Sequence, residues 1–148
     1  MKKNTRNPSM FYALNVVVPV FVGALLYLLF RRDSFLSETV YTYISVPEIS
    51  VSAMPPWVIT FLRNFASDVL WAYALLFSVS AVLRYSRKRL LASILICICF
   101  AIIIEALQKV GVFSGTFDVL DIVFEILAIG FGAIIIFLYE EIKNEKEH

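Results

Sequence analysis

Four long apolar runs constrain the fold of this chain more than any other feature. They cover residues 10–30, 57–83, 90–113 and 117–139. A helix needs about 20 apolar residues to cross the ~30 Å hydrocarbon core of a bilayer. The chain is 60% hydrophobic and 17% charged, whereas soluble domains average roughly 45–50% and about 25%. The sequence therefore predicts an all-α membrane protein, a four-transmembrane-helix bundle.

The second run is longer than one crossing requires. Pro55 and Pro56 suit the start of a helix, where a missing backbone N–H is tolerated. We expect the segment after them to lie near the surface and the span to begin near Ser67 or Asp68. The prediction is a single transmembrane domain over residues 1–148. Its spans cover about 10–30, 65–84, 90–112 and 117–139.

The external segment, residues 31–56, is the only long connection. Apolar and aromatic side chains recur in it at helical spacing, at Leu36, Val40, Tyr43 and Ile44. This spacing predicts a short external interfacial helix. A strand over residues 40–46 is the alternative, because β-branched and aromatic residues are dense there.

Basic residues favour one orientation. Nine of the 13 lysines and arginines lie before the first span, between the second and third, or after the fourth. The remaining four lie on the other side. Since basic residues collect in cytoplasmic loops, both termini are predicted to be cytoplasmic. Residues 139–148 are interpreted as a solvated, frayed tail, and a net charge of +1 gives no reason to expect a nucleic-acid partner.

Acidic residues gather in the outer half of the predicted bundle. Five fall at similar depth on three spans: Asp68, Glu105, Asp118, Asp121 and Glu125. Nearby polar residues are Arg63, Asn64, Gln108 and Lys109. A low-dielectric site does not hold several carboxylates unless they are protonated, hydrated or neutralised by a cation. The sequence thus predicts an outward-facing acidic pocket, with the acids, Arg63, Asn64 and Gln108 as candidate binding residues.

Capping and ion pairing offer a structural alternative for four of these acids. Asp118 suits the N-cap of the fourth span, with Asp121 at the third position of a capping box. Two ion pairs would account for the others, Glu105 with Lys109 and Arg63 with Asp68. Glu125 is left without a structural partner.

Small residues mark two helix-packing faces. Asn15, Pro19 and Gly23 form a stripe with a spacing of four along the first span. Ala128 and Gly132 form a small-xxx-small pair in the fourth. Such residues allow close helix approach in membranes.

Enzyme signatures are absent from the sequence. The only histidine is the terminal His148, and no Gly-x-Ser-x-Gly, His-Glu-x-x-His or glycine-rich phosphate loop occurs. These absences favour a non-enzymatic role without excluding an enzyme. We predict no cofactor and leave a metal undetermined.

The acidic motifs resemble the VanZ-like family of small bacterial membrane proteins. Glu105-Ala-Leu-Gln108 and Asp118-Val-Leu-Asp121 are similar to the family pattern on either side of a short external turn. Ala128 and Gly132 occupy its small positions, and residues 63–75 resemble the segment before its middle span. Glu125 stands where the family has Asn, and Gly115 where it often has Arg.

The resemblance implies a multi-pass protein of the bacterial plasma membrane and cell envelope. It also implies a link to antibiotic resistance, through the family's role in resistance to the glycopeptide teicoplanin. Our hypothesis is a non-enzymatic protein whose acidic pocket binds a polar headgroup, a cationic amphiphile or a cation. A proton- or ion-coupled carrier and a structural subunit of a membrane complex are the alternatives. Expected partners are the bilayer and an envelope lipid or cationic ligand, while a homo-oligomer or a membrane-protein partner is left open.

Overall fold

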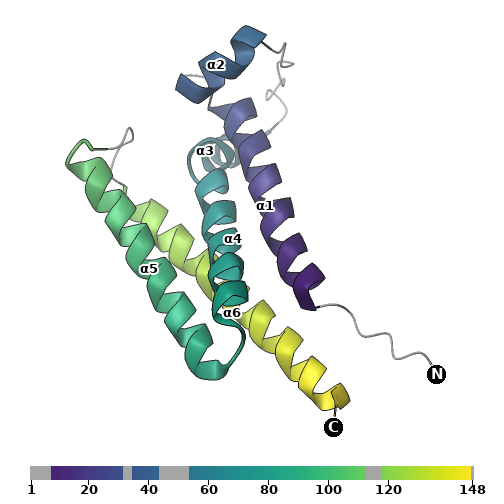
Figure 1. The fold of residues 1–148 in the computed structure, drawn as a ribbon. Coiled ribbons are helices and arrows are strands. Elements are labelled where there is room, and N and C mark those ends of the chain that lie inside the picture. Colours follow the sequence, from purple (N-terminus) through teal and green to yellow (C-terminus); the bar gives the residue numbers. More distant parts are fainter. Residues whose placement is uncertain (1–7, 32–34, 44–53, 113–117, 148) are drawn as a thin grey trace.

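The structure, a computed structural model, describes residues 8–31, 35–43, 54–112 and 118–147 (Figure 1). These residues form six helices and no strand: α1 (Pro8–Phe30), α2 (Phe35–Tyr43), α3 (Pro56–Asn64), α4 (Ala66–Leu83), α5 (Arg87–Lys109) and α6 (Val119–Glu147). The long helices α1, α4, α5 and α6 are apolar enough to cross a membrane. The predicted all-α membrane fold is confirmed. The predicted helix of the external segment is present as α2, residues 35–43, where the alternative was a strand over residues 40–46, while residues 44–53 lie outside the described part.

The second apolar run is divided into two helices. The first, α3, begins at Pro56, as expected for a proline in the first turn. It ends at Asn64. The next residue, Phe65, is the C-cap (φ −118°, ψ −30°), and its N–H still donates to the Phe61 carbonyl at 2.9 Å. The spanning helix α4 then starts at Ala66. The break lies where the length of the run placed the start of the span.

The helix α4 is the centre of the bundle. It contacts each of the other long helices α1, α5 and α6, and α5 also contacts α6. Figure 1 shows that α1 begins and α6 ends at the same end of the bundle. Here the Phe11 and Tyr139 rings stack with their centroids 3.6 Å apart.

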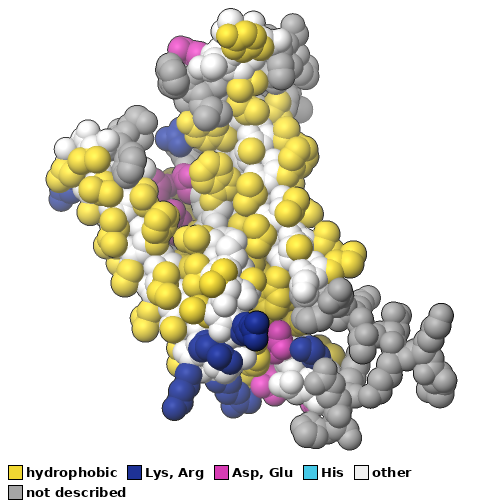
Figure 2. Space-filling model, viewed as in Figure 1, with side chains coloured by type: hydrophobic (Ala, Val, Ile, Leu, Met, Phe, Trp, Pro, Cys, Tyr) yellow, Lys and Arg dark blue, Asp and Glu magenta, His cyan; other side chains and the backbone are white. Residues whose placement is uncertain are grey.

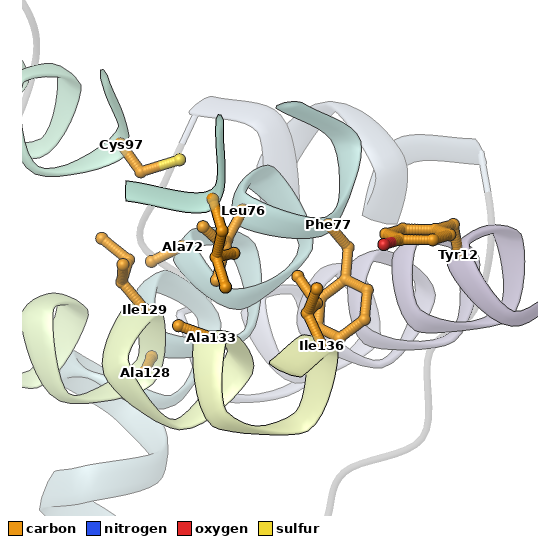
Figure 3. Close-up of a cluster of buried hydrophobic side chains, with 10 residues drawn as sticks. Tyr12, Ala72, Leu76, Phe77, Cys97, Ala128, Ile129, Ala133 and Ile136 are labelled. Atoms are coloured by element: carbon orange, nitrogen blue, oxygen red, sulfur yellow. The ribbon is translucent and has the colours of Figure 1, made fainter. Parts of the chain in front are cut away.

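The buried core lies in the middle of the bundle (Figure 3). Its fully buried members include Leu76 and Phe77 of α4 and Ile129 and Ile136 of α6, with Cys97 of α5 beside them. Since lipid chains are as apolar as these side chains, close packing rather than exclusion of water holds such helices together.

Both predicted packing faces are confirmed. A Cβ atom added at Gly23 would lie 2.7 Å from Trp71 Nε1, so α1 approaches α4 at a point that a larger residue would block. Along the same stripe, Tyr73 of α4 donates a hydrogen bond of 2.6 Å to Asn15 Oδ1. A Cβ at Gly132 would lie 3.1 Å from Leu76 Cδ2. By contrast, one at Gly130 meets nothing within 4 Å.

The prediction of a frayed, solvated tail is wrong for its first turn. The helix α6 continues to Glu147 because no glycine or proline interrupts its last turns. Glu140 is only 6% exposed and accepts a hydrogen bond of 3.1 Å from the Tyr12 hydroxyl. Glu141 forms an ion pair with Arg87 at 3.0 Å. These bonds attach the end of α6 to the starts of α1 and α5.

Candidate functional site

The N-terminus of α6 is capped by two carboxylates. Asp118 Oδ1 accepts a hydrogen bond of 2.9 Å from the Leu120 N–H, which confirms Asp118 as the N-cap. The N–H of Asp118 itself donates to Glu105 Oε2 at 3.2 Å. In a capping box this second bond would go to the residue at the third helical position, Asp121. That expectation is wrong, because a residue of α5 accepts the bond instead.

Glu105 therefore has a structural role that its sequence position did not reveal. It is 4% exposed and lies one turn before the end of α5. Its bond to the Asp118 N–H joins the two ends of the α5–α6 connection. Residues 113–117 of that connection lie outside the described part of the chain.

Two carboxylate oxygens on α6 have no hydrogen-bond partner. Asp121 Oδ1 and Glu125 Oε2 are both buried and make no hydrogen bond. The two residues are four positions apart, so their side chains lie on one face of α6. Most buried polar atoms in folded proteins are hydrogen-bonded, and these two exceptions mark one place on the helix.

Carboxylates from three helices act on these two side chains. Asp68 of α4 and Glu105 of α5 interact electrostatically with both Asp121 and Glu125. Asp118 interacts with Asp121 as well. The structure thus brings together all five predicted acids, which we call the acidic cluster: Asp68, Glu105, Asp118, Asp121 and Glu125.

A basic residue that was not among the predicted binding residues, Arg31, also acts on the acidic cluster. Arg31 follows the last residue of α1 and interacts electrostatically with Asp68 and Asp121. Its guanidinium also lies 5.6 Å from the centre of the Tyr27 ring. Its depth, directly after the first span and on the same side as the acids, was the signal that could have identified it.

The other predicted binding residues lie at the same end of the bundle. Arg63 and Asn64 are exposed at the end of α3, and Gln108 is half-buried near the end of α5. Lys109, also exposed, is the last residue of α5. These four residues belong to α3 and α5, whereas the two unpartnered oxygens belong to α6.

Acidic side chains appear in two places on the surface in Figure 2. Some lie in a notch between apolar parts of the bundle, and others lie beside the basic side chains at the opposite end. Within the described ranges, no group of three or more His, Cys, Asp or Glu side chains is arranged to hold a metal ion.

The chain was compared with known protein families, proteins and structures. No protein-family model, curated protein or solved structure matches the chain.

Proposed function

We propose that this chain is a cell-envelope protein whose acidic cluster binds the cationic group of an amphiphile or polar headgroup. One observation carries the proposal. Two buried carboxylate oxygens, on Asp121 and Glu125, have no hydrogen-bond partner. They also lie beside carboxylates of two other helices, Asp68 and Glu105.

The chemistry of the acidic cluster favours a cationic donor. A buried acceptor without a hydrogen-bond partner destabilises a protein by about 1–3 kcal/mol. A ligand that donates hydrogen bonds to both oxygens removes this cost, and the gain contributes to its binding free energy. An ammonium group carries three donors and a positive charge. Arg31 acts on Asp68 and Asp121 with a positive charge, while the cluster holds five carboxyl groups, so an added cation improves the local charge balance.

The core argues against a carrier that moves protons through the bundle. The next buried carboxylate on α6 is Glu140, 15 positions after Glu125. At 1.5 Å per residue they are separated by ~22 Å. The residues of α6 buried between them include Ala128, Ile129, Ala133 and Ile136, which cannot relay a proton. Binding at one end is therefore favoured over transport.

The setting of this function follows from the sequence resemblance and from charge. We place the protein in the bacterial plasma membrane with both termini in the cytoplasm, so the acidic cluster faces outward. The α4–α5 turn, the first turn of α5 and the far end of α6 all carry basic residues. They lie opposite the cluster (Figure 1), and this arrangement supports the orientation. The similarity to VanZ-like proteins makes glycopeptide resistance the physiological context to test.

The test uses dodecylammonium as a probe, below its critical micelle concentration, on the full chain in a neutral detergent. We expect it to raise the melting temperature of the wild type. Asp121→Asn and Glu125→Gln should each remove most of this increase. Arg31→Gln should enlarge it, because a competing positive charge is lost.

A matched control separates the site from the overall charge. Glu145→Gln removes the same charge from the exposed far end of α6 and should behave like the wild type. Wild-type protection in both Asp121→Asn and Glu125→Gln would refute the proposed site. For the physiological link, teicoplanin survival of cells that express the wild type or the double variant should differ. Equal survival would remove that link.

A further inference from the structure

A second polar site lies at the opposite end of the bundle. The turn between α4 and α5 forms a shallow depression lined by Ser80, Arg84, Tyr85, Arg89, Leu90 and Ser93. None of these residues belongs to the acidic cluster. The depression adjoins the N-terminus of α5, where the Ser86 side chain caps the helix by accepting the Arg89 N–H at 3.3 Å. The backbone dipoles of a helix place partial positive charge at this end.

Ser80 carries an unsatisfied hydroxyl into the depression. It is 4% exposed, and its Oγ has no hydrogen-bond partner. A serine within a helix ordinarily donates to the carbonyl four residues earlier. Ser78 does so to Ala74 at 2.9 Å, and Ser93 to Arg89 at 3.0 Å. Ser80 departs from this pattern where it lines the depression, and buried hydroxyls in folded proteins are ordinarily hydrogen-bonded.

Tyr85 contributes a second hydroxyl. Its oxygen is buried and makes no hydrogen bond of good geometry. Burial, and after it the negative charge of Glu141, raises the pKa of Tyr85, and the nearby Arg87 offsets part of this effect. The phenol therefore keeps its proton at neutral pH and can donate it in a hydrogen bond.

The two arginines are held at the rim of the depression. Arg84 is the only residue other than glycine with a positive φ among those described, at 56°. Side chains with a Cβ rarely adopt this conformation, and such strain concentrates at functional sites. Arg89 is oriented by the turn, because its Nε donates to Ser86 Oγ at 3.1 Å and its Nη2 to the Tyr85 carbonyl at 3.2 Å. Its remaining donor positions stay available.

We propose that this depression binds the phosphate of an anionic phospholipid in the leaflet at this end of the bundle. Two guanidinium groups, two hydroxyl donors and a helix N-terminus are groups that bind phosphate oxygens. The turn joins two membrane-spanning helices, α4 and α5, so it lies at the depth of lipid headgroups. Free phosphate shares this chemistry, and lipid is favoured by the position.

The test measures lipid binding to the full chain by native mass spectrometry. Purified protein is exposed to phosphatidylglycerol or phosphatidylcholine of the same acyl chains, or to inorganic phosphate. We expect phosphatidylglycerol to be retained at least tenfold more strongly than phosphatidylcholine. Arg84→Gln, Arg89→Gln and Ser80→Ala should each weaken that retention. The arginine variants should lose roughly tenfold, as expected for one charge-assisted hydrogen bond.

Lys88→Gln is the matched control. It removes one positive charge from the first turn of α5, next to Arg89, but Lys88 does not line the depression. Its retention of phosphatidylglycerol should fall less than twofold. An equal loss in Lys88→Gln and the two arginine variants would mean a diffuse basic surface and would overturn the proposal, as would equal retention of both lipids. If the protein retains inorganic phosphate but neither lipid, and the same variants lose this retention, the result would support the site with free phosphate as its ligand.

Discussion

Replacing Glu105 tests whether the acidic cluster is structural, functional or both. Glu105 Oε2 accepts the N–H of Asp118, the N-cap residue of α6, at 3.2 Å. Glu105→Gln keeps an oxygen acceptor but loses the charge, whereas Glu105→Ala loses both. Comparing the two variants therefore separates the hydrogen bond from the electrostatic contribution of the carboxylate.

The expected sizes follow from this geometry. A hydrogen bond to a charged group contributes about 1.5–3 kcal/mol. A length of 3.2 Å and a half-buried Asp118 place this one near the lower end. Removing the side chain of a residue that is 4% exposed adds about 1 kcal/mol for the space left behind. We expect Glu105→Ala to lower the free energy of unfolding by about 2–3 kcal/mol, and Glu105→Gln by less than ~1 kcal/mol.

Equilibrium unfolding in mixed micelles, with an increasing fraction of denaturing detergent, measures both values. Hydrogen exchange of the Asp118 amide reports the bond itself and should accelerate only in the alanine variant. Ile103→Ala, a truncation at a 55% exposed position of the same helix, is the control and should cost less than ~1 kcal/mol. Equal losses in Glu105→Gln and Glu105→Ala would show that charge, not the hydrogen bond, is the relevant property.

Two further predictions test the packing. Gly23→Ala places a Cβ 2.7 Å from Trp71 Nε1 and should destabilise the protein by about 1–3 kcal/mol. Gly130→Ala meets nothing within 4 Å and should be neutral or stabilising in the same unfolding assay, so equal losses would contradict the close α1–α4 approach. Tyr12→Phe removes the donor to the buried Glu140 and should cost about 1–3 kcal/mol. Adding Glu140→Gln to it should recover part of this loss, and a wholly additive double variant would contradict the pairing.

The spans could be predicted from the sequence because membrane crossing depends on length and apolar character alone. The division of the second run into α3 and α4 followed from the same reasoning, with Pro55 and Pro56 at its start. Counting residues from the ends of the spans also gives the depth of each side chain. Depth was sufficient to predict that the five acids meet at one level.

Rotation about each helix axis was not available from the sequence. Depth allowed either Asp121 or Glu105 to accept the N–H of Asp118, and only the packing of α5 against α6 selects Glu105. The same limit hid Glu140. Its position after the fourth apolar run indicated a solvated tail, yet the direction of its side chain places it against Tyr12.

Contacts made by α4 have a consequence for biosynthesis. The first two spans can pair as soon as both have left the ribosome, because α1 and α4 contact each other directly. The face of α4 that carries Leu76 and Phe77 acquires its partners on α6 only about 50 residues later in the chain. Until then a half-built bundle presents that face to lipid or to the insertion machinery. Substitutions there should impair late assembly and leave membrane insertion of the first half intact.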